Sequence, residues 1–138
     1  MAYGTHRALP VAFSSDPDTA SMGKVFDGID DALVSRISAQ PMWFLATAPL
    51  AVNGCVNVSP RGHDSFSIVG ARRVGWVDYT GSGVETIARL RENGRICVMF
   101  ASFDRRPHIV RLHGRGMVAA LDRVGANGLV VLRRNPGT

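Results

Sequence analysis

One stretch of the sequence, residues 76–100, combines a strand pattern, a glycine-bracketed turn, a helix pattern and a second strand pattern, WVDYTGSGVETIARLRENGRICVMF. The turn at residues 80–83 directly precedes the helix pattern, which ends at Asn93-Gly94, a pair typical of a left-handed helix cap. The first N–H groups of a helix have no partner within it and its dipole is positive there, so this turn can bind an anion such as phosphate. A second interpretation needs no ligand, because Ser82 and Glu85 have the S-x-x-E spacing of a capping box.

The overall composition indicates one globular domain. The chain has 138 residues, 46% of them hydrophobic and 20% charged, which is enough for a buried core and ordinary for a soluble protein. No apolar run approaches the roughly 20 residues of a membrane-spanning helix, and no signal-peptide pattern opens the chain. We therefore expect a cytoplasmic protein with no membrane partner.

The positive charge of the chain does not point clearly to nucleic acid. The net charge is +5 and the isoelectric point is near 10.2, which is compatible with an acidic partner. Of the 16 basic residues only Lys24 is lysine, and the arginines are spread along the chain instead of forming one block. An anionic small molecule fits this pattern at least as well, and we regard a nucleic-acid partner as unlikely.

The cysteine and histidine positions do not predict a metal site. Cys55 and Cys97 each lie in a strand-like apolar run and form no C-x-x-C motif, so we expect two buried, reduced thiols. His108 and His113 are five residues apart on a strand and would face opposite sides. No Ser-His-Asp order and no carboxylate pair stands out, so the sequence nominates no catalytic residue.

The N-terminal part divides into an extension and a helix. Residues 1–21 contain prolines and small polar residues without a period, and we expect a flexible extension. The single domain should then cover residues 22–138. Apolar residues recur at helical spacing within residues 25–39, which predicts an amphipathic helix that ends before Pro41.

The remaining patterns are mostly strands, which favours a mainly β (α+β) fold. Short strands with turns between them and few helices indicate an antiparallel barrel and not a doubly wound sheet. The dinucleotide fingerprint that starts at Gly81-x-Gly83 also fails, because Thr86 stands where the third glycine should be. The predicted strands cover residues 42–48, 56–61, 66–68, 74–79, 96–101 and 109–121, with a second helix at 84–93.

Two of these strands carry polar side chains in alternation. Asn57, Ser59 and Arg61 share one face, where the guanidinium suits a phosphate and the amide and hydroxyl suit a polar ring edge. A solvated outer face of an edge strand explains the same alternation equally well. Near the end of the strand list, Arg111, His113 and Arg115 share a face that could line a substrate side or a dimer interface, or simply be exposed.

Three of these segments resemble a known family. VNVSPRG at 56–62, DYTGSGVETIARLRENGRICVMF at 78–100 and RLHGRG at 111–116 resemble the pyridoxamine 5′-phosphate oxidase-like FMN-binding split-barrel proteins. The closer resemblance is to a small group that carries N-V-S-P-K-G and T-G-S-G-N-E-T. It covers roughly residues 22–123 and implies a six-stranded antiparallel split β-barrel with a few short helices, a homodimer, and FMN at the subunit interface.

The resemblance also implies which residues bind the cofactor. Arg61 stands where the group has lysine and should pair with the FMN phosphate, whereas Val84 replaces the usual asparagine. After about Arg123 the sequence looks truncated or altered relative to the group. The implied FMN-binding residues are Asn57, Val58, Ser59, Arg61, Asp78, Thr80, Gly81, Ser82, Gly83 and Thr86.

The activity that follows from the resemblance is that of an FMN-dependent oxidoreductase. It would transfer hydride or electrons between the bound flavin and an unidentified small-molecule substrate. The alternatives are a non-catalytic flavin- or tetrapyrrole-binding module, a deazaflavin-dependent reductase and, less favoured, a nucleic-acid-binding barrel.

Overall fold

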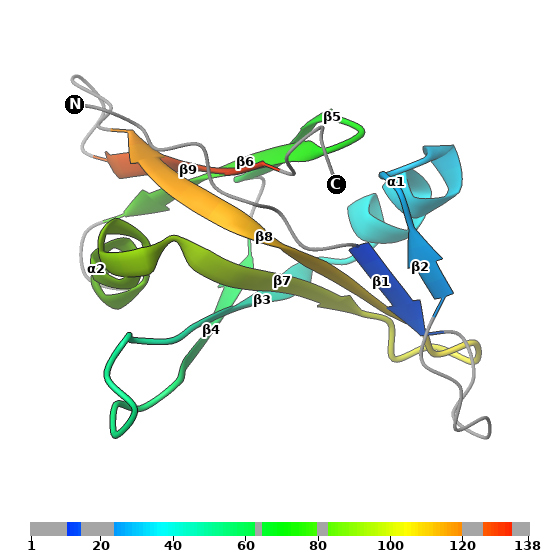
Figure 1. The fold of residues 1–138 in the computed structure, drawn as a ribbon. Helices are drawn as coiled ribbons and strands as arrows, with labels where there is room; N and C mark the ends of the chain where they lie inside the picture. Colours follow the sequence, from blue (N-terminus) through cyan, green and yellow to red (C-terminus); the bar gives the residue numbers. More distant parts are fainter. Residues whose placement is uncertain (1–10, 15–23, 63–64, 80–82, 120–125, 134–138) are drawn as a thin grey trace.

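The protein is a curled antiparallel sheet with two short helices (Figure 1). The computed structural model describes residues 11–14, 24–62, 65–79, 83–119 and 126–133. The strands in these ranges are β1 (Val11–Ser14), β2 (Lys24–Phe26), β3 (Met42–Thr47), β4 (Asn57–Gly62), β5 (Phe66–Gly70), β6 (Arg73–Tyr79), β7 (Arg95–Ala101), β8 (Ile109–Ala119) and β9 (Ala126–Arg133). The helices are α1 (Asp31–Ser38) and α2 (Val84–Asn93).

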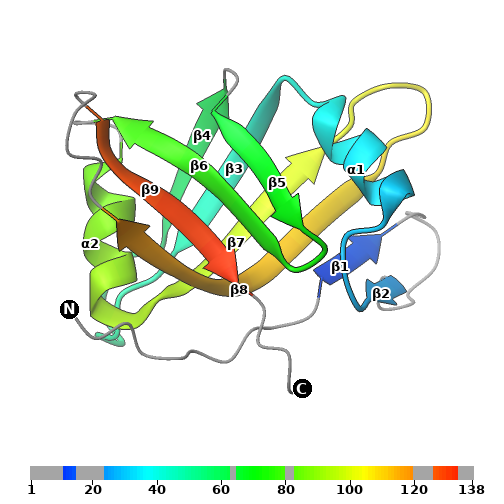
Figure 2. The same ribbon diagram turned by 90° about the horizontal axis from the view of Figure 1, so that it is seen from above.

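The strand order confirms the predicted antiparallel split barrel. Neighbouring strands pair in the order β4-β3-β7-β8-β9-β6-β5, with β1 joined to β8 and β2 joined to β1. The order begins at β4 and ends at β5, and no pairing joins these two strands in the described ranges. The two helices lie at opposite ends of the barrel (Figure 2). All six predicted strands are present, as β3 to β8.

Two strands lie in segments for which the sequence predicted something else. β1 falls inside the expected flexible extension of residues 1–21, yet Val11–Ser14 pair with the first four residues of β8, 109–112. β9 falls in the region that departs from the related group, and it pairs with both β8 and β6. Residues 126–133 therefore complete the sheet on the side of the barrel where β6 would otherwise be separated from β8.

An aromatic cluster forms the centre of the core. The Trp43 ring centroid lies 5.0 Å from that of Phe66 and 5.3 Å from that of Trp76, and Phe66 lies 4.9 Å from Phe100. Edge-to-face contacts at this spacing add about 0.5–1.5 kcal/mol per pair to the burial of the rings. Leu33 and Ile37, both buried, belong to the same core cluster, so α1 closes that end of the barrel.

The two helices compare differently with their predictions. The first helix begins at Asp31 and not at residue 25, because Asp30 is its N-cap and accepts a hydrogen bond from the N–H of Leu33 at 2.8 Å. The preceding residues are held elsewhere, since Ile29 N donates to the carbonyl of Ala71 at 2.7 Å. The second helix is confirmed over Val84–Asn93, with Gly94 at φ 71° as its left-handed cap.

β3 is buried on one face only, although its continuously apolar sequence is typical of a strand buried on both faces. In β3, Trp43, Leu45 and Thr47 are buried, whereas Phe44 and Ala46 are only half-buried. The strand therefore has an inner face, directed to the core, and an outer face.

None of the described helices is long and apolar enough to cross a membrane.

Candidate functional site

The register between β3 and β4 decides which way the predicted polar strand faces. The Cα partners are Thr47 with Asn57, Leu45 with Ser59 and Trp43 with Arg61. Directly opposed residues of an antiparallel pair project to the same face. Asn57, Ser59 and Arg61 therefore lie on the inner face, as an extension of the core side of β3.

The outer face of β4 is apolar. Val58 is 62% exposed and Pro60 is exposed as well. The alternative in which the polar triplet forms a solvated outer face is therefore wrong. The side chain of Val58 points away from Asn57 and Ser59, so only the backbone of this residue can contribute to a site beside them.

The second predicted segment supplies an uncapped helix start. Gly83 is the N-cap of α2, with no side-chain hydrogen bond to the cap, and its carbonyl accepts from the N–H of Ile87 at 2.9 Å. The predicted capping box needs Ser82 at the N-cap, so the helix starts one residue too late for it; Ser82 itself lies outside the described residues. Without a capping side chain on Gly83, the first N–H groups of α2 keep their capacity for an anion.

The two predicted segments meet in space. The side-chain amide of Asn57 lies 3.3 Å from Ser59 Oγ and 3.5 Å from Thr86 Oγ1. Thr86 is fully buried, at 0% exposure, in the first turn of α2. Asn57, Ser59 and Thr86 thus form one polar cluster, the name used below, which joins β4 to the start of the helix.

Thr47 is a neighbour of this cluster that the sequence did not single out. It lies opposite Asn57 in the register and is only 3% exposed. Its hydroxyl has no hydrogen-bond partner among the described residues, and a buried hydroxyl of this kind normally has one. Once β3 is read as alternating, Thr47 is the one polar residue on its inner face, which is the signal that would have identified it.

The other predicted cofactor residues are placed unevenly. Arg61 is half-buried and donates from Nη1 to the carbonyl of its neighbour Pro60 at 3.0 Å. Asp78 lies in β6, where its backbone pairs with Gly128 of β9. Thr80, Gly81 and Ser82 lie outside the described residues, so the phosphate-side turn is represented by Gly83 and the helix that follows it.

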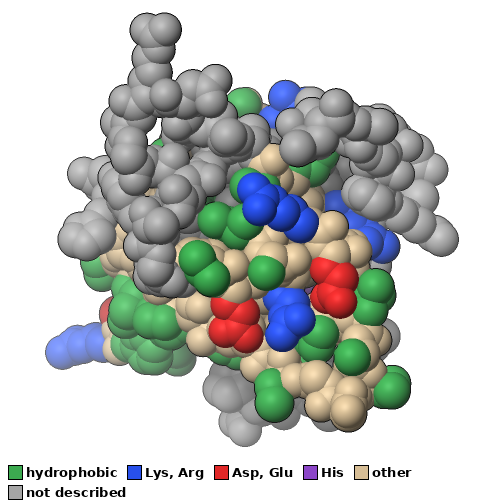
Figure 3. All heavy atoms as spheres, turned by 90° about the vertical axis from the view of Figure 1, so that its left-hand side faces the viewer, with side chains coloured by type: hydrophobic (Ala, Val, Ile, Leu, Met, Phe, Trp, Pro, Cys, Tyr) green, Lys and Arg blue, Asp and Glu red, His purple; other side chains and the backbone are tan. Residues whose placement is uncertain are grey.

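The surface over α2 carries charges of both signs. Arg89 lies 3.8 Å from Glu85 and 3.8 Å from Glu92 along this helix. On the side of the molecule where α2 lies, basic and acidic side chains are mixed with hydrophobic ones (Figure 3). Exposed pairs of this kind contribute about 0–1 kcal/mol each. The visible part of this face is therefore not the continuous basic surface that nucleic-acid binding needs.

The polar cluster can bind and orient a ligand, but it cannot itself exchange protons near neutral pH. Its three side chains are an amide and two alcohols, which donate and accept hydrogen bonds without titrating. Together with the start of α2 they suit a polar ring edge joined to an anionic group. In the described part of the chain, no group of three or more His, Cys, Asp or Glu residues could hold a metal ion.

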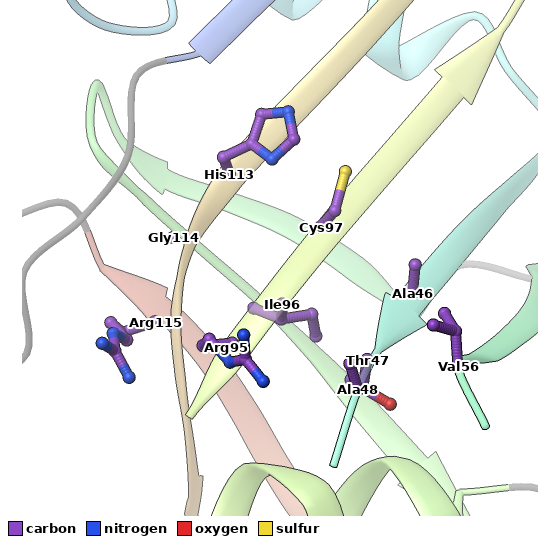
Figure 4. A pocket seen from close by; sticks show the side chains of 10 residues that line it. All are labelled: Ala46, Thr47, Ala48, Val56, Arg95, Ile96, Cys97, His113, Gly114 and Arg115. Carbon is purple, nitrogen blue, oxygen red and sulfur yellow. The ribbon is translucent and has the colours of Figure 1, made fainter. Parts of the chain in front are cut away.

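A separate hollow lies on the outer face of the sheet. This outer pocket has a volume of about 420 Å³ and is formed by the end of β3, the beginning of β7 and the middle of β8 (Figure 4). His113 and Arg115, which the sequence placed on a shared face, both line it. Arg111, the third member of that set, does not.

The titratable groups of the outer pocket are shifted by burial. Burial lowers the pKa of His113 below 6.5, and the nearby Arg111 lowers it further. Burial raises the pKa of the Cys97 thiol, which Arg111 opposes. Both groups are therefore uncharged at neutral pH.

The prediction of two buried thiols is wrong for Cys55, which is exposed in the loop before β4, while Cys97 is half-buried.

The sequence comparison identifies one related protein over most of the described domain. No family model matches the chain. Over 95 residues, 67% of this chain, the sequence is 44% identical to the pyridoxamine 5′-phosphate oxidase family protein ustO of Aspergillus flavus. The chain spans 38% of the length of that relative.

Solved structures share the fold at low sequence identity. HupZ of Group A Streptococcus has a TM-score of 0.63 at 17% identity, covering 78% of this chain and 90% of that one. A proposed pyridoxamine 5′-phosphate oxidase of Lactobacillus delbrueckii scores 0.65 at 14% identity, covering 80% and 93%. An FMN-binding protein of Syntrophomonas wolfei scores 0.55 at 17% identity, covering 72% and 77%. The resemblance to pyridoxamine 5′-phosphate oxidase-like split-barrel proteins is confirmed.

Proposed function

We propose that the protein binds FMN and acts as an FMN-dependent oxidoreductase on a small-molecule substrate. The observation that carries the proposal is the contact between Asn57 of β4 and Thr86 of α2. It brings together two segments whose sequences separately resemble the FMN-binding motifs of this family. A chance resemblance of either segment would not require the two to be neighbours in the fold.

The residues present fit a phosphorylated flavin. The uncapped start of α2 offers backbone N–H groups and the positive end of the helix dipole to a phosphate. Asn57 and Ser59 would hold the polar edge of the ring, and the partnerless hydroxyl of Thr47 is a further donor beside them. Arg61, on the same face of β4, would pair with the phosphate.

The chemistry of these side chains indicates which roles belong to the protein and which to the cofactor. When bound, FMN supplies the hydride and electron chemistry. The polar cluster binds and orients the ring edge, and the buried position of Thr86 keeps that part of the site dry. No general acid or base is assigned, because Asn57, Ser59 and Thr86 do not titrate near neutral pH.

The protein should act as a homodimer with the flavin site at the subunit interface. Val56, directly before β4, and Val58, on the outer face of β4, are 66% and 62% exposed and lie two residues apart on the same face. An exposed apolar patch of neighbouring residues is a common mark of a protein contact. Val58→Asp should convert the dimer to a monomer in analytical ultracentrifugation; a wild-type protein that sediments as a monomer would contradict this part of the proposal.

The experiment that tests the proposal is a flavin titration of the purified protein. FMN should bind with quenched flavin fluorescence and a shifted visible spectrum, and Ser59→Ala should weaken the binding. Parallel titrations with a deazaflavin and with haemin separate the cofactor alternatives. Absence of any spectral change or quenching with FMN would contradict the proposal.

Turnover separates an enzyme from a carrier. With FMN bound, addition of NADH or NADPH without oxygen should bleach the flavin absorbance, and an added dye acceptor should restore it. Binding without reduction by these or other donors would favour the non-catalytic flavin-binding module. The uncharged polar cluster is equally compatible with that function.

A further inference from the structure

We propose that the outer pocket is a second binding site, which takes a small organic carboxylate between Arg95 and Arg115. The carboxylate group would pair with the two guanidinium groups, and an apolar body would lie on the floor of the pocket. This inference does not depend on flavin binding.

The pocket lies mainly on the other face of the sheet from the polar cluster. Ala46, which lines the pocket, pairs with Val58 on one side and Cys97 on the other, so all three lie on the outer face. Asn57 lies on the inner face, opposite Thr47. The pocket and the polar cluster therefore lie mainly on opposite faces of the sheet, and they meet at Thr47, which lines the pocket and lies opposite Asn57.

Two fixed cations form one end of the pocket. Arg95 and Arg115 are direct cross-strand partners of β7 and β8, and like charges in this relation repel. Arg95 Nη2 donates to the carbonyl of Pro49 at 3.0 Å, and Arg115 Nη1 donates to the carbonyl of Asn93. Each guanidinium has five N–H donors, so one backbone contact leaves others for a ligand. An anion between the two groups would use these donors and relieve their repulsion.

The rest of the pocket is mainly apolar and carries no opposing charge. Ala46, Val56 and Cys97 line it beyond the arginines, and none of its described lining residues is acidic. Figure 4 shows the two arginines at one end, His113 near the other, and Ala46 and Val56 across from them. The volume of about 420 Å³ lies within the range of ordinary small-molecule sites. A neutral His113 can add one hydrogen bond without adding charge.

The matched probes are 2-naphthoate and its uncharged analogue 2-naphthamide, titrated calorimetrically into the full chain. We expect naphthoate to bind at least about tenfold more tightly than naphthamide, the size of effect expected for a charge-assisted hydrogen bond. Arg95→Gln should remove about tenfold of the naphthoate affinity, whereas the same change at the exposed loop residue Arg105 should not.

A second variant tests the cavity without altering its charge. Ala46→Leu fills the apolar part and should also abolish naphthoate binding, while thermal unfolding shows whether each variant is folded. Equal binding of the two probes, unchanged affinity in both pocket variants, or no saturable naphthoate binding up to about 1 mM would overturn the proposal. Displacement of naphthoate by FMN would also overturn it, because the anion would then lie in the polar cluster.

Discussion

The side-chain amide of Asn57 and the hydroxyl of Thr86 lie 3.5 Å apart, although the two residues are 29 positions apart in the chain. This contact joins β4, the edge strand with which the barrel order begins, to the first turn of α2. This hydrogen bond is long. Its main effect is to orient the Asn57 amide relative to the uncapped start of the helix.

Thr86→Val tests whether this orientation matters for cofactor binding. The substitution keeps the shape of the buried side chain and removes its hydroxyl, so FMN affinity should fall by about 3- to 10-fold, the effect of one net hydrogen bond. Thr86→Ser, which retains the hydroxyl, should lose less. Fluorescence titration with FMN measures both. Equal affinities for wild type and Thr86→Val would mean that Thr86 is a core residue only.

Arg61 and Glu85 provide a ranking test for the position of the phosphate. Arg61→Ala removes a cation from the inner face of β4 and should weaken FMN binding by about tenfold or more. Glu85→Ala removes only an exposed partner of Arg89, 3.8 Å away, and should change the affinity by less than about threefold. The opposite ranking, measured in the same titration, would place the phosphate elsewhere.

Gly94→Ala should destabilise the fold through backbone strain. Gly94 has φ 71°, where an L-residue costs about 1–2 kcal/mol, although a Cβ there would meet no atom closer than 3.5 Å. We expect the unfolding midpoint to fall by roughly 3–8 °C in calorimetry. Gly70→Ala is the matched control, because a Cβ at Gly70 meets nothing within 4 Å and its φ is not positive. Equal midpoints for the two variants would contradict this account.

His113 should make stability depend on pH below neutrality. Its pKa is lowered from 6.5 in the folded protein, so the unfolded chain binds the proton more readily. The folded state therefore loses stability as the pH falls below about 6.5 towards the lowered value, and regains it above. His113→Gln removes this contribution, so the variant should lose less of its midpoint between pH 7.5 and pH 5.5 than the wild type. Parallel melting curves at the two pH values measure the difference.

The two cysteines should differ strongly in reactivity. Cys55 is exposed, whereas burial both shields the Cys97 thiol and raises its pKa, which lowers the thiolate fraction. With iodoacetamide at pH 8, Cys55 should be alkylated at least about tenfold faster in the native protein. Peptide mass spectrometry over time resolves the two sites, and equal rates would show that Cys97 is reached by solvent.

Much of the fold could be predicted because its signals are local. Continuous or alternating apolar residues marked the strands that became β3 to β8. Asn93-Gly94 ended α2 at the predicted residue, because glycine adopts φ 71° without strain. The errors are also local in origin. The first helix was predicted too long because Phe26 and Ile29 fit the helical period, although β2 and the contact of Ile29 with Ala71 hold these residues.

The face of β4 and the surroundings of Thr47 could not be predicted in the same way. Alternation shows that Asn57 and Ser59 share a side, but only the pairing with Thr47 and Leu45 shows that this is the core side. The strand β9 was also missed, because its pairing with β6 and β8 depends on partners far away in the chain.

The sequence by itself determined the strand and helix patterns, the glycine cap and the two motifs that resemble a flavin site. These depend on backbone preferences and on neighbours within a few residues, which a pattern records directly. Only the tertiary structure decided that Asn57 meets Thr86, that Thr47 has a buried hydroxyl without a partner among the described residues, and that Arg95 and Arg115 lie side by side at one end of a pocket. These relations depend on strand register and on contacts between distant segments, and no local period encodes them.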